Sequence, residues 1–313
     1  MDIIKEKQQL WAKRNKKNMR TDHKYYTDSI DSNIYNGLSS KTKEAFDKAD
    51  GGELKGNPIP MTALHSSSAL CVNVFQYFEN FSTKPDLALE ILKACKLIDD
   101  KKYKGKITTF EFECKRFSIK NDNKIISTPN IDVIIETISD SGKKQIFAIE
   151  SKFTEPYGTV DNFLAEKYYI PENESIWNSL GSLYESLNID QTNEITRIIK
   201  RDGKEISKKG KQILAEYKHL NALQLIKHLM GVCGDEKWKN KSHITLVYVW
   251  YDVLGKDGFQ HRNEIKEFRE LIEKNTGIRF RDISYQELIY NLNKQLPYNE
   301  HKEYLNYITE RYL

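Results

Sequence analysis

Two short apolar runs joined by a polar turn constrain the fold of this chain more than any other feature. The runs are residues 131–135 (IDVII) and 146–152 (IFAIESK), and a stretch rich in Ser, Asp and Gly lies between them. This pattern predicts two buried strands in a hairpin. Buried strands rarely carry charge, because an unpaired carboxylate or ammonium is costly to remove from water. Yet Asp132 interrupts the first run, and Glu150 and Lys152 end the second.

These charged residues predict a divalent-cation site. Side chains alternate along a strand, so Glu150 and Lys152 share one face while Ser151 points away. Mg2+ takes oxygen ligands, and one or two carboxylates with a substrate phosphate can complete its shell. We therefore expect Asp132 and Glu150 to hold the metal. Lys152 would offset the negative charge that develops while a phosphodiester is hydrolysed.

The order Asp132, then Glu150-Ser151-Lys152 on the next strand, resembles the PD-(D/E)XK nuclease superfamily, which includes most type II restriction endonucleases. The proline expected just before the aspartate is replaced by Ile131. The resemblance implies an α/β fold: a restriction-endonuclease-like core with a central mixed sheet flanked by helices, and extra N- and C-terminal helical elements. It also implies Asp132 and Glu150 as metal ligands, Lys152 as the catalytic lysine, Mg2+ (for which Mn2+ can substitute) as cofactor, double-stranded DNA as partner, and a homodimer.

Further acidic residues are candidates for the same site. The superfamily often adds a carboxylate from the helix before the sheet or from its first strand, which points to Glu90 and Glu113, with Glu79 a weaker candidate. Glu155 could orient Lys152 or a metal-bound water. A solvated glutamate or a surface ion pair is the alternative for each of them.

Net charge is only +4, so the distribution of basic residues carries more information than their number. One basic cluster lies in residues 1–20 and another in 197–211, and phosphate contacts dominate affinity for DNA. His65, at the start of an expected helix, could contact a phosphate or simply cap or pack. The candidate DNA-contacting residues are His65, Lys13, Arg14, Lys16, Lys17, Arg197, Lys200, Arg201, Lys208 and Lys209.

The chain divides into a basic N-terminal arm (1–60), a nuclease core (61–255) and a C-terminal α/β extension (256–313). Hydrophobic content is 39% and no long apolar run occurs, so we expect a cytoplasmic protein without membrane contact. Hydrophobic periodicity and breakers predict the remaining elements. Helices are expected over 3–20, 40–49, 66–80, 87–97, 173–188, 211–232, 261–275, 285–294 and 298–311, strands over 108–119, 243–254 and 278–283, and a polar loop over 191–210.

The leading hypothesis is a Mg2+-dependent restriction endonuclease. A repair or modification-dependent nuclease remains an alternative within the same chemistry. A non-catalytic nucleic-acid-binding module is the alternative from another class, although such a module would be expected to have lost one of the three key residues.

Overall fold

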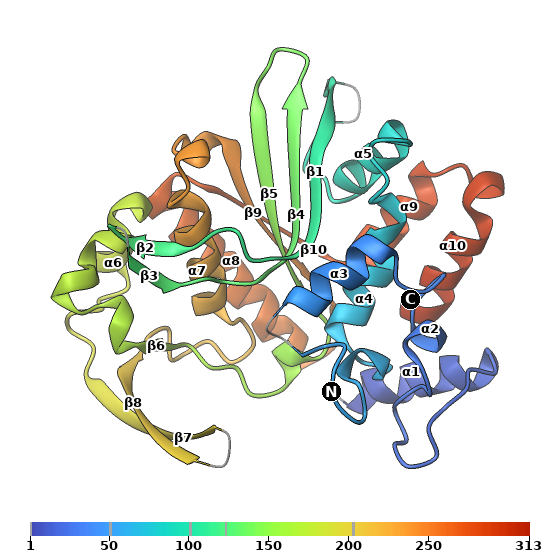
Figure 1. The fold of residues 1–313 in the computed structure, drawn as a ribbon, viewed down its shortest axis with the longest axis horizontal. Coiled ribbons are helices and arrows are strands. Elements are labelled where there is room, and N and C mark those ends of the chain that lie inside the picture. The colour runs from blue at the N-terminus through green and yellow to red at the C-terminus, as the bar shows by residue number, and fades with distance from the viewer. Residues whose placement is uncertain (1, 50–51, 100–101, 123, 202–203) are drawn as a thin grey trace.

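A five-stranded mixed β-sheet forms the centre of the computed structural model, which describes residues 2–49, 52–99, 102–122, 124–201 and 204–313 (Figure 1). Its strands, in spatial order, are β1 (Gly105–Cys114), β4 (Ile131–Ser139), β5 (Lys144–Lys152), β9 (Ile244–Trp250) and β10 (Arg279–Ser284). β1, β4 and β5 pair antiparallel, whereas β5, β9 and β10 pair parallel. The predicted mixed sheet and its central hairpin are confirmed.

Helices cover both faces of this sheet, because its strands alternate apolar side chains between two cores. On β4, Val133 and Ile135 enter one core, while Ile134 enters the other. On β5, Ile149 and Ala148 divide in the same way. Since each face buries a row of apolar side chains, each needs its own layer of helices.

The layer on the right of Figure 1 contains helices from both ends of the chain, and the layer on the left contains helices from its middle and later part. The right-hand helices are α1 (Asp2–Arg14), α2 (Ile30–Asn33), α3 (Ser40–Lys48), α4 (Ser67–Phe75), α5 (Pro85–Ala94), α9 (Tyr285–Gln295) and α10 (Tyr298–Tyr312). The left-hand helices are α6 (Leu183–Ser186), α7 (Ala222–Cys233) and α8 (Lys256–Thr276).

Two smaller sheets lie outside the central one. β2 (Ile119–Asn121) and β3 (Lys124–Ser127) pair as a short hairpin. The other sheet has the order β6-β8-β7, with β6 (Phe163–Ala165), β7 (Glu194–Arg201) and β8 (Lys204–Gln212). In Figure 1, β7 and β8 project from the body at the lower left. We call the β7–β8 hairpin the arm; it is a different segment from the N-terminal residues 1–60.

Several sequence-based predictions of secondary structure were wrong. The helix expected over 173–188 is a 3-10 helix, Pro171–Leu180, followed by the short α6. The strand expected over 108–119 ends at Cys114.

Residues 191–210, expected to form a polar loop, contain most of the arm. Its strands β7 and β8 pair in a regular antiparallel ladder, although their side chains are mostly polar or charged. The helix expected over 211–232 begins only at Ala222, where the Asn221 side chain accepts the backbone N–H of Gln224. The helix expected over 3–20 ends at Arg14, and Lys16 has a φ of +49° that an α-helix cannot contain.

The ends of the chain meet on the right-hand layer. Lys7 Nζ donates to the backbone oxygen of Leu313 at 2.5 Å, and Gln8 donates to the backbone of Arg311. β10 comes from the region 256–313 and forms an edge of the central sheet. One core includes residues from before position 60 and after position 255. The domain limits at 60 and 255 stay predictions. Among the described residues, no helix is long and apolar enough to cross a membrane.

Candidate active site

Asp132 and Glu150 lie where the β4–β5 ladder ends. The last paired residues are Val133 and Ile149, and one residue further on each strand is a carboxylate. Beyond the ladder, the backbone N–H of Ser151 donates to Asp132 Oδ2 at 2.7 Å. The side chain of Asp132 thus takes the place of a strand partner, which holds its carboxylate at the end of β5.

The Glu150 carboxylate is held between two cationic or donor groups. Lys152 Nζ lies 2.5 Å from Oε1, and His228 Nε2 on α7 lies 2.7 Å from Oε2. Burial raises the pKa of Glu150, but Lys152 and His228 outweigh burial and hold it at about 2. Burial lowers the pKa of Lys152, yet Glu150 and Asp132 raise it above its ordinary value. Glu150 is therefore ionised and Lys152 protonated at neutral pH.

Asp132 has the opposite preference. Burial, followed by repulsion from Glu150, raises its pKa well above the ordinary value, and Lys152 only partly opposes this. Without a further cation, the pair Asp132 and Glu150 favours a single negative charge over two. A divalent cation would relieve that repulsion, which fits two carboxylates that face each other across the end of a ladder.

Glu113 joins these residues from the end of β1. Its backbone has a φ of +48°, a left-handed conformation just before the last paired residue of β1, and its carboxylate accepts the side-chain amide of Asn130. Burial, with repulsion from Glu53 and Glu150, raises its pKa to about 7. Of the candidates for a further carboxylate, the structure brings Glu113 to the centre.

Glu53 belongs to the same group, and the sequence analysis missed it. Burial raises its pKa, and it interacts electrostatically with Glu155 and Lys152. No hydrophobic pattern marks its segment, which lies between α3 and α4. Five carboxylates thus act on the single ammonium of Lys152: those of Glu53, Glu113, Asp132, Glu150 and Glu155.

Glu155 fastens the turn after β5 to the start of α4. Its Oε2 accepts the Ser67 hydroxyl and the backbone N–H of Thr154, the latter at 2.9 Å. His65 lies nearby, half-buried beside the rings of Tyr25 and Tyr26. Burial and the charge of Lys5 lower the pKa of His65 to about 4, so its ring is neutral at pH 7 and gives no charge attraction to a phosphate.

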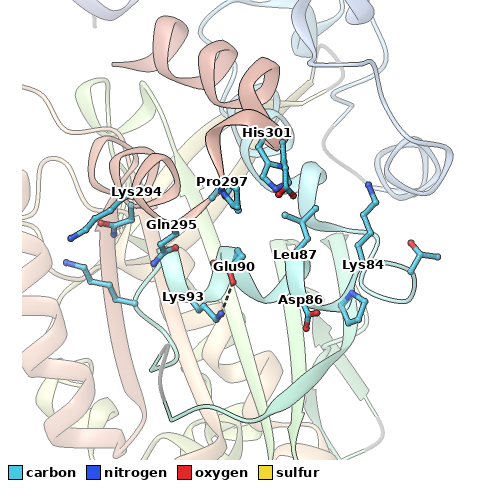
Figure 2. Close-up of a pocket in the computed structure, with 15 residues that line it drawn as sticks. Lys84, Asp86, Leu87, Glu90, Lys93, Lys294, Gln295, Pro297 and His301 are labelled. Carbon is cyan, nitrogen blue, oxygen red and sulfur yellow. Dashed lines mark hydrogen bonds and ion pairs between the residues drawn. The ribbon is translucent and has the colours of Figure 1, made fainter.

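Glu90 lies apart from these residues. It forms an ion pair with Lys93 at 2.7 Å on α5 and lines a hollow of about 1080 Å³ that also borders the turn between α9 and α10 (Figure 2). Glu79 is buried and accepts the Thr42 hydroxyl at 2.9 Å. The structure therefore does not bring either residue to Lys152.

His228 is the second residue that the sequence analysis missed. Two other polar residues near it have structural partners: His219 bonds the backbone oxygen of Pro156, and Asn221 caps α7. A signal for His228 existed. It is a polar residue on an otherwise apolar helix face, between Ile226 and Leu229, and such a residue needs a buried hydrogen-bond partner.

The residues present fit a hard cation, although the described part of the chain holds no group of three or more His, Cys, Asp or Glu side chains spaced for a metal ion. Glu150 Oε1 is buried, and no hydrogen-bond donor is aligned with it even though the Lys152 ammonium is close. Mg2+ keeps several waters and needs only one or two protein carboxylates. Asp132 and Glu150 are the residues that would supply them.

The candidate DNA-contacting residues are dispersed. Lys13 and Arg14 end α1, and Lys16 and Lys17 follow it, with Lys17 Nζ lying 5.4 Å from the ring centre of Trp11. On the arm, Arg197 bonds Asp161, and Lys209 lies 3.7 Å from Glu194. Lys200 and Arg201 belong to the backbone of β7, and their side chains lie outside the described part of the structure.

A mixed sheet covered on both faces, with carboxylates and a lysine gathered where its central strands end, defines an α/β protein with a restriction-endonuclease-like core. The chain belongs to the family described as Restriction Endonuclease associating with ARP, whose model matches residues 5–313. That family is one of restriction-type nucleases. No match was found among curated proteins or among solved structures.

Proposed function

We propose that this protein is a Mg2+-dependent endonuclease of the PD-(D/E)XK type that hydrolyses DNA phosphodiester bonds, acting as a type II restriction endonuclease in restriction-modification or phage defence. The observation that carries the proposal is the meeting of Asp132, Glu150 and Lys152 at the end of one strand ladder. Membership of a restriction-endonuclease family supports the substrate class.

Each side chain has a role that follows from its charge. Asp132 and Glu150 would bind Mg2+, which when bound polarises a phosphate and acidifies a water. Lys152 stays protonated, because the surrounding carboxylates raise its pKa. It therefore serves as a fixed positive charge for the phosphate oxygens rather than as a general base. His228 donates to Glu150 and orients its carboxylate for the metal.

The decisive experiment is cleavage of an unmodified plasmid with Mg2+, compared with Lys152→Ala and Asp132→Asn. We expect discrete fragments from the native protein and a loss of about 100-fold or more in rate from each variant, with DNA affinity of Lys152→Ala retained in EDTA. Glu90→Gln is the matched control, since Glu90 lies outside the site, and it should cut normally. Full activity of Lys152→Ala would overturn the assignment.

Other outcomes separate the alternatives. A smear of products would favour a nonspecific or repair nuclease, and cutting confined to methylated DNA a modification-dependent one. Binding without cutting of either DNA would favour a non-catalytic module. A restriction enzyme that cuts both strands at a palindrome needs two-fold symmetry, so we propose a homodimer on DNA. Light scattering should give a mass near twice 36.7 kDa for the protein in that complex.

A further inference from the structure

The arm has two faces of different charge, which its strand register defines. On the first face, Arg197 pairs with Lys208 and Ile199 with Ile206. On the second, Glu194 pairs with Lys211, and Thr196 with Lys209. Among the arm residues whose side chains are described, carboxylates occur only on the second face. The first face is therefore a cationic and aliphatic surface, and the second is balanced in charge.

The cationic face turns toward the body of the protein. Arg197 Nη1 lies 2.7 Å from Asp161, just before β6, and its guanidinium packs on the ring of Phe163. Lys208 interacts electrostatically with two lysines of the body, Lys167 and Lys227. Basic side chains of the arm, of α7 and of the segment after β6 therefore lie near one another.

Lys167, Lys208 and Lys227 form an unusual cluster there. Lys167 precedes Tyr168, Lys227 lies on α7, and the ammonium groups of both lie over the Tyr168 ring, 5.0 Å and 5.2 Å from its centre. In the described part of the structure, none of the three lysines forms a salt bridge with a carboxylate, and Asp161 reaches Lys227 only through longer-range attraction.

Within the described residues, no carboxylate forms an ion pair with this cluster, and the Lys167 ammonium donates to the backbone oxygen of Ile126 at 2.8 Å. Burial, and then repulsion from Lys167 and Lys208, lowers the pKa of Lys227 to about 8. A chain that holds three like charges together without a counter-ion sacrifices stability, and an anion bound between them would restore it. One aromatic ring beneath two ammonium groups only partly offsets their repulsion.

We propose that Lys167, Lys208 and Lys227 together bind a backbone phosphate of the DNA, beside the phosphate that is cut at Lys152. The inference rests on the proposed nuclease function. Lys227 is adjacent in sequence to His228, which bonds the catalytic carboxylate of Glu150. α7 therefore presents one residue to the catalytic group and the next to the lysine cluster. Because DNA carries phosphates at short, regular intervals, one strand can occupy both places.

The test compares two adjacent lysines of the arm. Lys208→Gln and Lys209→Gln make the same change in charge, but only Lys208 lies on the cationic face. We expect Lys208→Gln to lower affinity for a 30-base-pair duplex in EDTA by about tenfold and to reduce the salt slope of binding by about one. Lys209 was also a DNA-contacting candidate from the sequence, but the strand register places it on the other face, beside Glu194. Lys209→Gln should therefore change affinity less than about twofold. Equal losses in the two variants would overturn the proposal.

A second variant tests Lys227, the half-buried member of the cluster on α7. Lys227→Met keeps the aliphatic contact with Tyr168 and removes the charge. We expect its melting temperature to be unchanged or higher and its DNA affinity to fall about tenfold. A loss of stability with unchanged affinity would contradict the proposal. If Lys227→Met does not fold, the exposed Lys208 still decides the outcome.

Two further measurements identify the source of the anion and show which proposal has failed. Inorganic phosphate that raises the melting temperature of the native protein, while both lysine variants bind DNA normally, would identify an anion site without a role in DNA binding and would refute the proposal. If the native protein neither binds nor cuts DNA, the nuclease function itself fails. If it binds and cuts DNA, but Lys208→Gln and Lys209→Gln lose the same affinity for the duplex, only the phosphate site at the lysine cluster is refuted.

Discussion

At the scale of single residues, the centre of this protein is an excess of carboxylates around one ammonium. Glu150 stays ionised although it is buried, because Lys152 and His228 lower its pKa. Burial instead raises the pKa of Glu113 and Asp132, which favours their protonated forms. The site is therefore poised for a divalent cation, because a metal would let these carboxylates ionise together.

Glu113 should make the metal-free protein less stable as pH rises. Its pKa in the folded state, about 7, is above that of an ordinary glutamate, so its contribution to stability is full below about pH 4.5 and is lost as pH rises through 7. In EDTA, we expect the free energy of unfolding to fall from pH 5 to pH 8, by at most about 1.4 kcal/mol per pH unit from this group. Urea titrations at several pH values measure it.

Glu113→Gln removes the titrating group and should flatten this dependence. The variant keeps the shape of the side chain and can still bond Asn130. A slope identical to that of the native protein would show that Glu113 is ionised throughout this range, against the raised pKa.

At the scale of elements, α7 is positioned by close contact through a glycine. A Cβ built on Gly231 would lie 2.8 Å from the backbone oxygen of Phe117 and 3.0 Å from Pro129. α7 therefore approaches the chain before β2 and β4 more closely than a side chain permits. The same helix carries His228 and Lys227, so its depth in the structure sets their positions.

Gly231→Ala should destabilise the protein although alanine favours helices. The gain in helix propensity is about 1 kcal/mol, and forcing a methyl group against backbone costs about 1–3 kcal/mol. We expect a net loss of about 1 kcal/mol by urea denaturation, together with slower cleavage, since α7 and His228 must shift from Glu150. An increase in stability with unchanged cleavage would show that the space around residue 231 accepts a methyl group without moving α7.

The arm shows what local patterns miss. Its sequence is polar and basic, and Gly203 and Gly210 interrupt it, which predicted a loop. Cross-strand pairing over the whole of β7 and β8 made it a hairpin instead. Gly210 is required there for close approach, since a Cβ would lie 2.4 Å from the backbone oxygen of Leu164 on β6.

At the scale of the whole molecule, a buried arginine joins three distant segments. Arg311 on α10 has no exposed surface, and its guanidinium donates to the backbone and side-chain oxygens of Asn33 and to Gln8. It also lies 4.3 Å from the ring centre of Trp11. These contacts tie α1, α2 and α10 into the right-hand layer.

Arg311→Leu should therefore cost about 1–3 kcal/mol of unfolding free energy, because it leaves the buried side-chain oxygens of Asn33 and Gln8 without the donors they have now. Arg279→Leu is the control, since Arg279 is exposed on β10 and its loss should change stability by less than about 0.5 kcal/mol. Thermal and urea unfolding measure both. Equal effects in the two variants would mean that water replaces the lost donors.

The strands that carry the site could be predicted from local sequence alone. Short apolar runs predicted β4, β5 and β9. Charges within the first two runs marked Asp132, Glu150 and Lys152, because a charge in a buried strand needs a partner. Periodicity also predicted α9 and α10, whose apolar faces repeat regularly.

The distant side chains that join these residues became clear from the folded arrangement. Glu53 and His228 lie about 100 and 80 residues from Glu150, and no local pattern relates such positions, because burial and charge pairing act through space. The same holds for Lys167, Lys208 and Lys227, which three separate elements bring together. A strand can be predicted from a short apolar run, whereas the set of residues in a site depends on how sheets and helices pack.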